Sequence, residues 1–289
     1  MKRRTLLRLT GAMLAASGIA GWSLTRHDGQ QVLLSARDGA DGQHYAVGYR
    51  LDGSQVFATP VAERCHDVYP HPYLPLAVFV GRRPSRESYL IDARDGRLLQ
   101  VMASPADRHF YGHGVFHKDG EWFYTTENDT ADAGRGVLGV YRLEGRQLVR
   151  VGEHATHGIG PHQLLWMPDN ETLVIANGGI RTEADSREMM NLDAMEPSLV
   201  LLCRDGTLGE AQRQIMNQYT ASLAIHDELR LLAVTAPRGN KVFIWDLDST
   251  ELRQAAHVPD CAGVAAVAEG FVVSSGQGRC RLFDCRGER

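Results

Sequence analysis

The sequence predicts an all-β protein, a β-propeller of six or seven four-stranded blades. The first observation is a histidine-led phrase that recurs about 48 residues apart, at His66, His113 and His162. A fixed period of roughly 40 to 50 residues matches the size of one propeller blade. The second observation is that long stretches with helical periodicity are absent, while the chain contains 30 glycines. This combination is typical of a β protein with many turns.

Each histidine opens the first of two hairpins in its repeat. The segment that starts at His113 turns at Asp119 and Gly120 and returns from Trp122. A second hairpin follows in each repeat, with Asp-Gly or Glu-Gly turns at residues 52–53, 95–96, 144–145 and 205–206. Such pairs favour tight hairpins, because the turn requires a positive φ that glycine adopts easily. Two hairpins supply the four strands of one blade.

Later repeats keep the hairpins but lack the histidine. Their first strands are expected at residues 221–225 and 261–264. We predict that the strand around residues 31–34 completes the C-terminal blade and closes the ring, which would remove exposed sheet edges. A pair of β-sandwiches or a β-helix is the alternative, but a sandwich has no reason to keep so regular a period.

Composition supports a single folded domain over residues 27–289. The chain has 289 residues, of which 43% are hydrophobic, and all-β folds of this size often form one domain. Its formal charge of −4 provides no basic field for nucleic acid, and lysines and arginines form no stripe interleaved with aromatics. We therefore expect that the protein does not bind nucleic acid. It is also expected to be a monomer.

Residues 1–26 are predicted to be an export segment. Arg3 and Arg4 precede leucines and a mildly apolar stretch that is diluted by glycines. Paired arginines before a weakly hydrophobic stretch fit a twin-arginine signal, which predicts a periplasmic location. An uncleaved N-terminal membrane anchor is the alternative. Past this segment no run reaches the roughly 18 apolar residues of a membrane helix.

The five cysteines leave at least one thiol unpaired. In an oxidising periplasm, Cys280 has two possible disulfide partners, Cys261 and Cys285. Free buried thiols are an equally good interpretation, because cysteine is among the most buried residue types. Cys65 adjoins His66, so we also consider that it faces the same space.

The recurring histidines are the best candidates for a site. The first strand of each propeller blade lines the central channel, so His66, His113 and His162 should converge near one mouth. Neutral imidazole is the commonest protein ligand for transition metals. Together with the carboxylate of Glu127, the three histidines predict a site for iron, copper or zinc. The alternative is that the imidazoles only form hydrogen bonds between blades.

The segment from residue 178 to 197 interrupts the repeat. An insertion on a propeller face often has a function. Within it, Arg181, Arg187 and Asn191 are predicted to hold an anionic ligand over the channel, with Asn177 at the border of the same cavity. A solvated charged loop is the alternative. The sequence contains no Gly-x-Ser-x-Gly motif and no phosphate-binding loop.

Several motifs resemble one known family. They lie at Tyr111–Phe116, Thr126–Asp129, Gly136–Tyr141, Gly158–His162 and Ala176–Ile180. Together they resemble the domain-of-unknown-function family 1513, twin-arginine-exported bacterial propellers that are similar to lactonase-type and quinoprotein-type propellers. The resemblance implies a role in metal handling or redox, with periplasmic metal-uptake or redox proteins as partners. The chain is shorter than the family pattern at residues 209–219, where we expect an abbreviated or missing blade.

Three functions follow from these observations, in order of preference. The first is a periplasmic propeller that binds a transition metal near its channel. The second is a lactonase-like hydrolase, in which Glu127, Asn177 and an aspartate hold a calcium ion that polarises a carbonyl group. The third is a non-catalytic scaffold that docks another protein. The sequence does not decide whether the protein is an enzyme.

Overall fold

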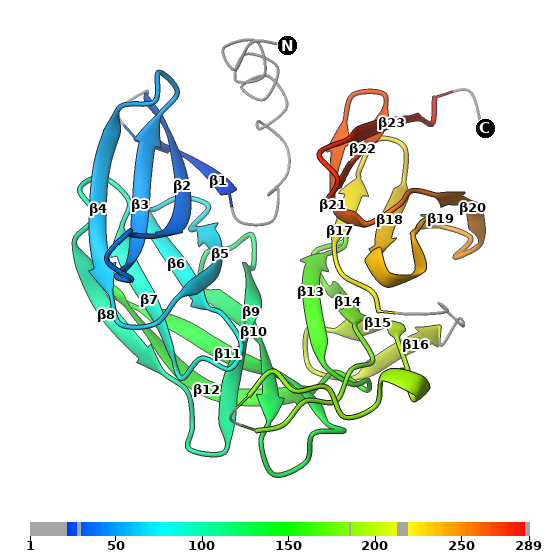
Figure 1. Cartoon of the computed structure of the whole chain (residues 1–289), viewed down its shortest axis with the longest axis horizontal. Helices are drawn as coiled ribbons and strands as arrows, with labels where there is room; N and C mark the ends of the chain where they lie inside the picture. The colour runs from blue at the N-terminus through cyan, green and yellow to red at the C-terminus, as the bar shows by residue number, and fades with distance from the viewer. Residues whose placement is uncertain (1–21, 28–29, 185, 213–218, 287–289) are drawn as a thin grey trace.

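The computed structural model describes residues 22–27, 30–184, 186–212 and 219–286. This part of the chain folds into antiparallel β-strands and two short 3-10 helices, which confirms the predicted all-β class. Its strands form six separate sheets that follow one another around a common centre (Figure 1). None of the described helices has the length and apolar character to cross a membrane.

Each sheet is built from consecutive strands. The first contains β1 (Trp22–His27), β2 (Gln30–Asp38), β3 (His44–Arg50) and β4 (Gln55–Val61). The second contains β5 (Cys65–Pro70), β6 (Leu76–Gly81), β7 (Glu87–Asp92) and β8 (Leu98–Ala103). The third contains β9 (Arg108–Phe116), β10 (Trp122–Asp129), β11 (Gly136–Glu144) and β12 (Gln147–Ala155).

The remaining three sheets repeat this order. The fourth contains β13 (Pro161–Trp166), β14 (Thr172–Asn177), β15 (Ser198–Cys203) and β16 (Leu208–Gln212). The fifth contains β17 (Leu223–His226), β18 (Leu231–Ala236), β19 (Lys241–Asp246) and β20 (Leu252–His257). The sixth contains β21 (Cys261–Val267), β22 (Gly270–Ser275) and β23 (Cys280–Asp284). The predicted four-stranded repeat is thus confirmed for five of the six sheets.

The first strand of each sheet lies nearest the centre. Strand β9 contacts β5 on one side and β13 on the other, and β17 likewise contacts β13 and β21. Strands at the inner edge of a ring approach their counterparts in both neighbouring sheets most closely. The residues of these first strands therefore surround the centre, as the repeat pattern predicts.

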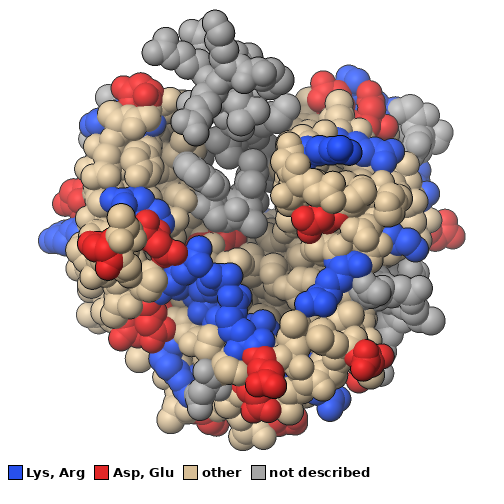
Figure 2. All heavy atoms as spheres, viewed as in Figure 1, with Lys and Arg blue, Asp and Glu red and all other residues tan. Residues whose placement is uncertain are grey.

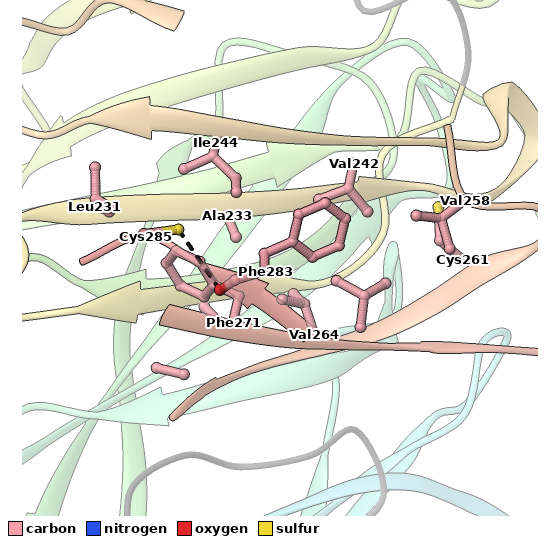
Figure 3. Close-up of a cluster of buried hydrophobic side chains, with 13 residues drawn as sticks. Leu231, Ala233, Val242, Ile244, Val258, Cys261, Val264, Phe271, Phe283 and Cys285 are labelled. Carbon is pink, nitrogen blue, oxygen red and sulfur yellow. Dashed lines mark hydrogen bonds between the residues drawn. The ribbon is translucent and has the colours of Figure 1, made fainter. Parts of the chain in front are cut away.

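Apolar side chains hold neighbouring sheets face to face. Between the fifth and sixth sheets, Val242 and Ile244 of β19 pack with Phe271 of β22 and Phe283 of β23 (Figure 3). Four further clusters join the other successive sheets in the described chain. Full burial of one such side chain contributes about 1.5 to 3 kcal/mol, so these interfaces supply much of the stability.

The predicted closure of the ring by the N-terminal strand is wrong. Residues 31–34 lie in β2, which pairs with β1 and β3 inside the first sheet, and not with the last sheet. The strand β1 adjoins β2 in sequence, and pairing with a sequence neighbour closes a far shorter loop than pairing across the whole chain. The sixth sheet accordingly has three strands in the described residues.

Three other expectations concern the export segment, the abbreviated blade and the disulfides. Most of the predicted export segment, residues 1–21, lies outside the described residues, and residues 22–26 form part of β1. An abbreviated or missing blade was expected at residues 209–219. The fourth sheet has all four of its strands, the last of which ends at Gln212. Residues 213–218 lie outside the described chain. Cys280 forms a disulfide with neither Cys261 nor Cys285, so neither expected pairing is present.

Candidate metal centre

A β-bulge positions each of the three histidines. The pairing of β5 with β6 shifts between Cys65 and Asp67, which leaves His66 outside the ladder. The pairing of β13 with β14 shifts in the same way around His162. Around His113 the irregularity is larger, because residues 111–113 of β9 lie opposite one residue of β10. Bulges re-aim side chains, and here all three turn toward the centre.

The three imidazoles form one cluster. One ring nitrogen from each lies within 4.8 Å of the other two. The ring of His113 is central, with its centroid 4.8 Å from that of His66 and 4.5 Å from that of His162. Nitrogen ligands of a single zinc ion lie about 3 to 4 Å apart, given bonds of about 2.0 to 2.1 Å. Separations of up to 4.8 Å exceed this spacing, so the rings would have to move closer together to share one ion.

A carboxylate and a hydroxyl fix the tautomer of His113. Its Nδ1 lies 3.0 Å from Asp67 Oδ2 and 2.9 Å from the Tyr69 hydroxyl, which itself donates to the same carboxylate oxygen at 2.7 Å. A buried carboxylate holds a proton on Nδ1, so the lone pair is left on Nε2. That Nε2 is buried and has no hydrogen-bond partner among the described residues. This is the arrangement of a histidine prepared to bind a cation.

His162 presents a second free nitrogen. Its Nδ1 is buried without a hydrogen-bond partner in the described chain. The backbone of Ala221 hydrogen-bonds the same ring, and the ring of Tyr219 packs edge-on against it at 5.4 Å. The ring thus has one bonded and one unbonded nitrogen, and the unbonded Nδ1 is the candidate metal ligand.

Burial keeps two of the rings uncharged. Desolvation and the neighbouring His113 lower the pKa of His66 to about 3. Desolvation, reinforced by the other two histidines, places the pKa of His162 well below its ordinary value. Both are therefore neutral near pH 7, and neutral imidazole is the form that binds metals.

The next two sheets carry alanine at the same position. Ala221 precedes β17 and Ala262 follows the first residue of β21, each in the place that the histidine takes in the earlier sheets. A bulge between Cys261 and Gly263 repeats the local geometry around Ala262. Three imidazoles thus line one side of the centre, and small side chains line the side that the fifth and sixth sheets provide.

The opposite end of the innermost strands borders a separate cavity of about 900 Å³. Its lining includes Tyr69, Phe116 and Trp166, which lie at or near the ends of β5, β9 and β13. His66 and His162 are the second residues of β5 and β13, and His113 lies three residues before the end of β9. Tyr69 belongs to both regions, because it lines this cavity and its hydroxyl bonds His113. It separates the cluster from the cavity.

Glu127, predicted as a metal ligand, does not lie with the histidines. Its carboxylate accepts hydrogen bonds from Tyr141 and Thr125 at 2.9 and 3.0 Å, and forms an ion pair with Arg150 at 2.9 Å. The cluster of candidate ligands found in the described residues contains the three histidines without this carboxylate. Residues along a strand point alternately to opposite faces, and Glu127 points to the face of its sheet that carries Thr125, Tyr141 and Arg150.

The other predicted ligand-binding residues are divided between two places. Asn177 is buried at the end of β14, where its Nδ2 donates to the Thr156 carbonyl and the Ser198 hydroxyl and its Oδ1 has no hydrogen-bond partner in the described chain. In the insertion, Asn191 accepts from the backbone of Arg181 and so shapes the loop itself. Arg187 acts on the cluster, since its charge contributes to the lowered pKa of His66, and Asn177 pairs with Pro161, the residue before His162.

The sequence interpretation missed Asp67, Tyr69 and two arginines. Asp67 follows His66 directly but serves the histidine of the next sheet, at 3.0 Å. The signal available in the sequence was a carboxylate in a place where the second and third repeats have Gly114 and Gln163. Arg82 and Arg83, which follow β6, also influence the pKa values of the cluster histidines. Cys65 belongs to the apolar core and not to this site.

Glycines near the cluster accommodate the protein's own side chains. A Cβ atom at Gly112 would lie 2.7 Å from Cδ2 of His66, and one at Gly160 would lie 2.8 Å from the Tyr111 hydroxyl. Gly112 also has a φ of 114°, which L residues rarely adopt. The close approach of β9 to His66 therefore requires glycine.

Comparison with known proteins gives a family and a fold. No curated protein matches the sequence. The structure is similar to a solved structure of hydrazine synthase from Kuenenia stuttgartiensis, with a TM-score of 0.66, 10% sequence identity and coverage of 89% of this chain and 90% of that one. At this identity the likeness shows the fold alone. A family model described as "Protein of unknown function (DUF1513)" matches residues 59–214 and 207–288. The chain therefore belongs to the DUF1513 family.

Proposed function

We propose that this protein binds one transition-metal ion through His66, His113 and His162 at the centre of a six-bladed β-propeller. The observation that carries the proposal is the pair of buried, unpartnered nitrogens, Nε2 of His113 and Nδ1 of His162, on rings 4.5 Å apart. An unsatisfied buried polar atom costs about 1 to 3 kcal/mol. Two of them side by side, next to a third imidazole, are explained by a cation that accepts their lone pairs.

The donor set indicates the class of metal. Three imidazoles suit zinc, copper or iron, whereas calcium and magnesium prefer oxygen ligands. Three protein ligands leave at least one coordination position open, which distinguishes reactive zinc sites from closed structural ones. The alanines on the other side of the centre provide room for a further ligand. The protein is accordingly proposed to handle or use its metal, and not only to be stabilised by it.

The proposed setting is the periplasm. Its support is the pair of arginines near the N-terminus, which predicts twin-arginine export of a folded chain. Folded export allows a metal to be inserted before the protein crosses the membrane. Periplasmic metal-uptake or redox proteins are the proposed partners.

Metal titration tests this function directly. Apo protein is titrated with Co²⁺ and Zn²⁺, and the bound metal is counted by elemental analysis after gel filtration. One equivalent of metal should bind per chain. The Co²⁺ form should show the visible absorption bands of a low-coordinate Co²⁺ site. A His113→Ala, His162→Ala double variant should lose this metal.

The matched control is His117→Ala. His117 is also buried next to β9, but its ring bonds the Asn170 carbonyl and Asp119 instead of facing the cluster. This variant should keep the full equivalent of metal. If wild-type protein binds none of the metals, or the double variant binds as well as wild type, the proposal is wrong and a scaffold role becomes the better explanation.

A further inference from the structure

Three arginines from distant parts of the chain lie close enough to act electrostatically on the histidine cluster. Arg82 and Arg83 follow β6, and Arg187 lies in the insertion between β14 and β15. The charges of Arg82 and Arg187 both act on His66, and that of Arg83 acts on His162. Figure 2 shows basic side chains gathered around the central hollow of the face in view. We call Arg82, Arg83 and Arg187 the arginine rim.

Acidic side chains do not neutralise the arginine rim. Nearby, Arg64 pairs with Asp38 and Arg181 pairs with Glu196. By contrast, no carboxylate in the described chain forms an ion pair with any of the three rim arginines. Arg83 instead donates to the Tyr111 hydroxyl and lies over the ring of that tyrosine, 4.8 Å from its centroid. Among the described residues the rim therefore holds positive charge without a paired carboxylate, and Asp38, whose charge acts on Arg82, is itself paired with Arg64.

The three guanidinium groups repel one another. Burial lowers the pKa of Arg82, and Arg187 and Arg64 lower it further. Burial also lowers the pKa of Arg187, with Arg83 as the next cause. Like charges held together next to neutral imidazoles are destabilising unless an anion joins them.

We propose that the arginine rim binds a small oxyanion, with carboxylate or phosphate oxygens, directly above the three-histidine centre. The guanidinium fork matches both groups with two parallel hydrogen bonds. The buried, unpartnered nitrogens of His113 and His162 lie below the rim, so the site has polar groups in its floor as well as at its edge. When a metal is bound, an anion held here lies next to the open coordination position.

This inference goes beyond the metal proposal and is tested without metal. Apo protein is titrated by calorimetry with inorganic phosphate and, separately, with succinate at low ionic strength, where charge interactions are least screened. An anion that the rim recognises should bind with a stoichiometry of one per chain. The anion that binds more tightly identifies the chemical class of the natural ligand.

The arginines of the insertion supply a test variant and its control. Arg187→Ala should weaken anion binding roughly 10-fold or more, the usual effect of losing a charge-assisted hydrogen bond. Arg187→Lys should recover part of the loss. Arg181→Ala, six residues earlier in the same loop, should change binding less than about twofold, because Arg181 already pairs with Glu196.

The outcomes separate the two proposals. Anion binding that depends on Arg187 supports the rim even if the protein binds no metal. If neither anion binds to wild-type apo protein, or if Arg187→Ala binds as tightly as wild type, the rim is not an anion site. Metal binding by the three histidines is unaffected by that result.

Discussion

The contact between Asp67 and His113 offers the sharpest test of the metal centre. In an Asp67→Asn variant the side chain keeps its shape but loses its charge. Nδ1 of His113 lies 3.0 Å from Asp67 Oδ2, and Asp67 is only 5% exposed, so water does not replace the lost charge. The neutral amide accepts the same hydrogen bond but makes Nε2 a weaker donor to a metal.

The expected loss is 10- to 100-fold in metal affinity, the usual effect of removing such a supporting carboxylate. This corresponds to about 1.4 to 2.7 kcal/mol of binding free energy. Zinc affinity is measured by competition with a chromophoric chelator, at fixed pH and ionic strength. Urea unfolding of the apo variant, run in parallel, separates a loss of affinity from a loss of fold.

Tyr69→Phe is the matched control. It removes the hydroxyl that donates to the same carboxylate at 2.7 Å but leaves the pair of Asp67 and His113 intact. Its zinc affinity should fall less than that of Asp67→Asn. Equal affinities for Asp67→Asn and wild type would show that the carboxylate does not prepare His113 for a metal, and the argument from the tautomer would fail.

Three further predictions concern the surroundings of the site. Gly112→Ala should destabilise the fold by about 1 to 3 kcal/mol and weaken zinc binding, because the new Cβ would lie 2.7 Å from the ring of His66; wild-type stability and affinity would contradict this. Glu127→Gln should cost about 1 to 3 kcal/mol in urea unfolding, because it removes the buried carboxylate partner of Arg150 and leaves that guanidinium paired with Glu153 only, while the metal content counted by elemental analysis stays at the wild-type level. Glu153→Gln should flatten the dependence of folding stability on pH. Hydrogen bonds from arginines lower the pKa of Glu153 to about 2. The ionised carboxylate therefore contributes at most about 3 kcal/mol to the free energy of unfolding, a contribution that is present above pH 4.5 and is lost as the pH falls through 2. Urea unfolding between pH 2 and 7 would refute this last point if the two curves ran parallel.

The repeat in the sequence predicted much of the fold and the core of the site. The spacing of His66, His113 and His162 was sufficient, because equivalent residues on equivalent strands point the same way in every sheet. The spacing of the repeat did not predict the role of Glu127. Its partner Arg150 lies on another strand of the same sheet, and which face a residue takes near a bulge depends on the register of that bulge.

Contacts between different sheets could not be predicted from the sequence either. Asp67 lies next to one histidine in sequence but bonds the histidine of the following sheet, and a one-dimensional repeat carries no information on that pairing. The same holds for Arg187, whose pKa is lowered by the charge of Arg83, about a hundred residues earlier in the chain. Tertiary packing decides these contacts.

The local pairing of β1 with β2 has a consequence for how the protein folds. Every sheet is completed by one continuous stretch of chain, so no strand has to wait for the C-terminus before it finds its partner. Low contact order of this kind favours fast folding that proceeds from one sheet to the next. All three imidazoles belong to the first 162 residues, so the ligand set can assemble before the last two sheets have been synthesised.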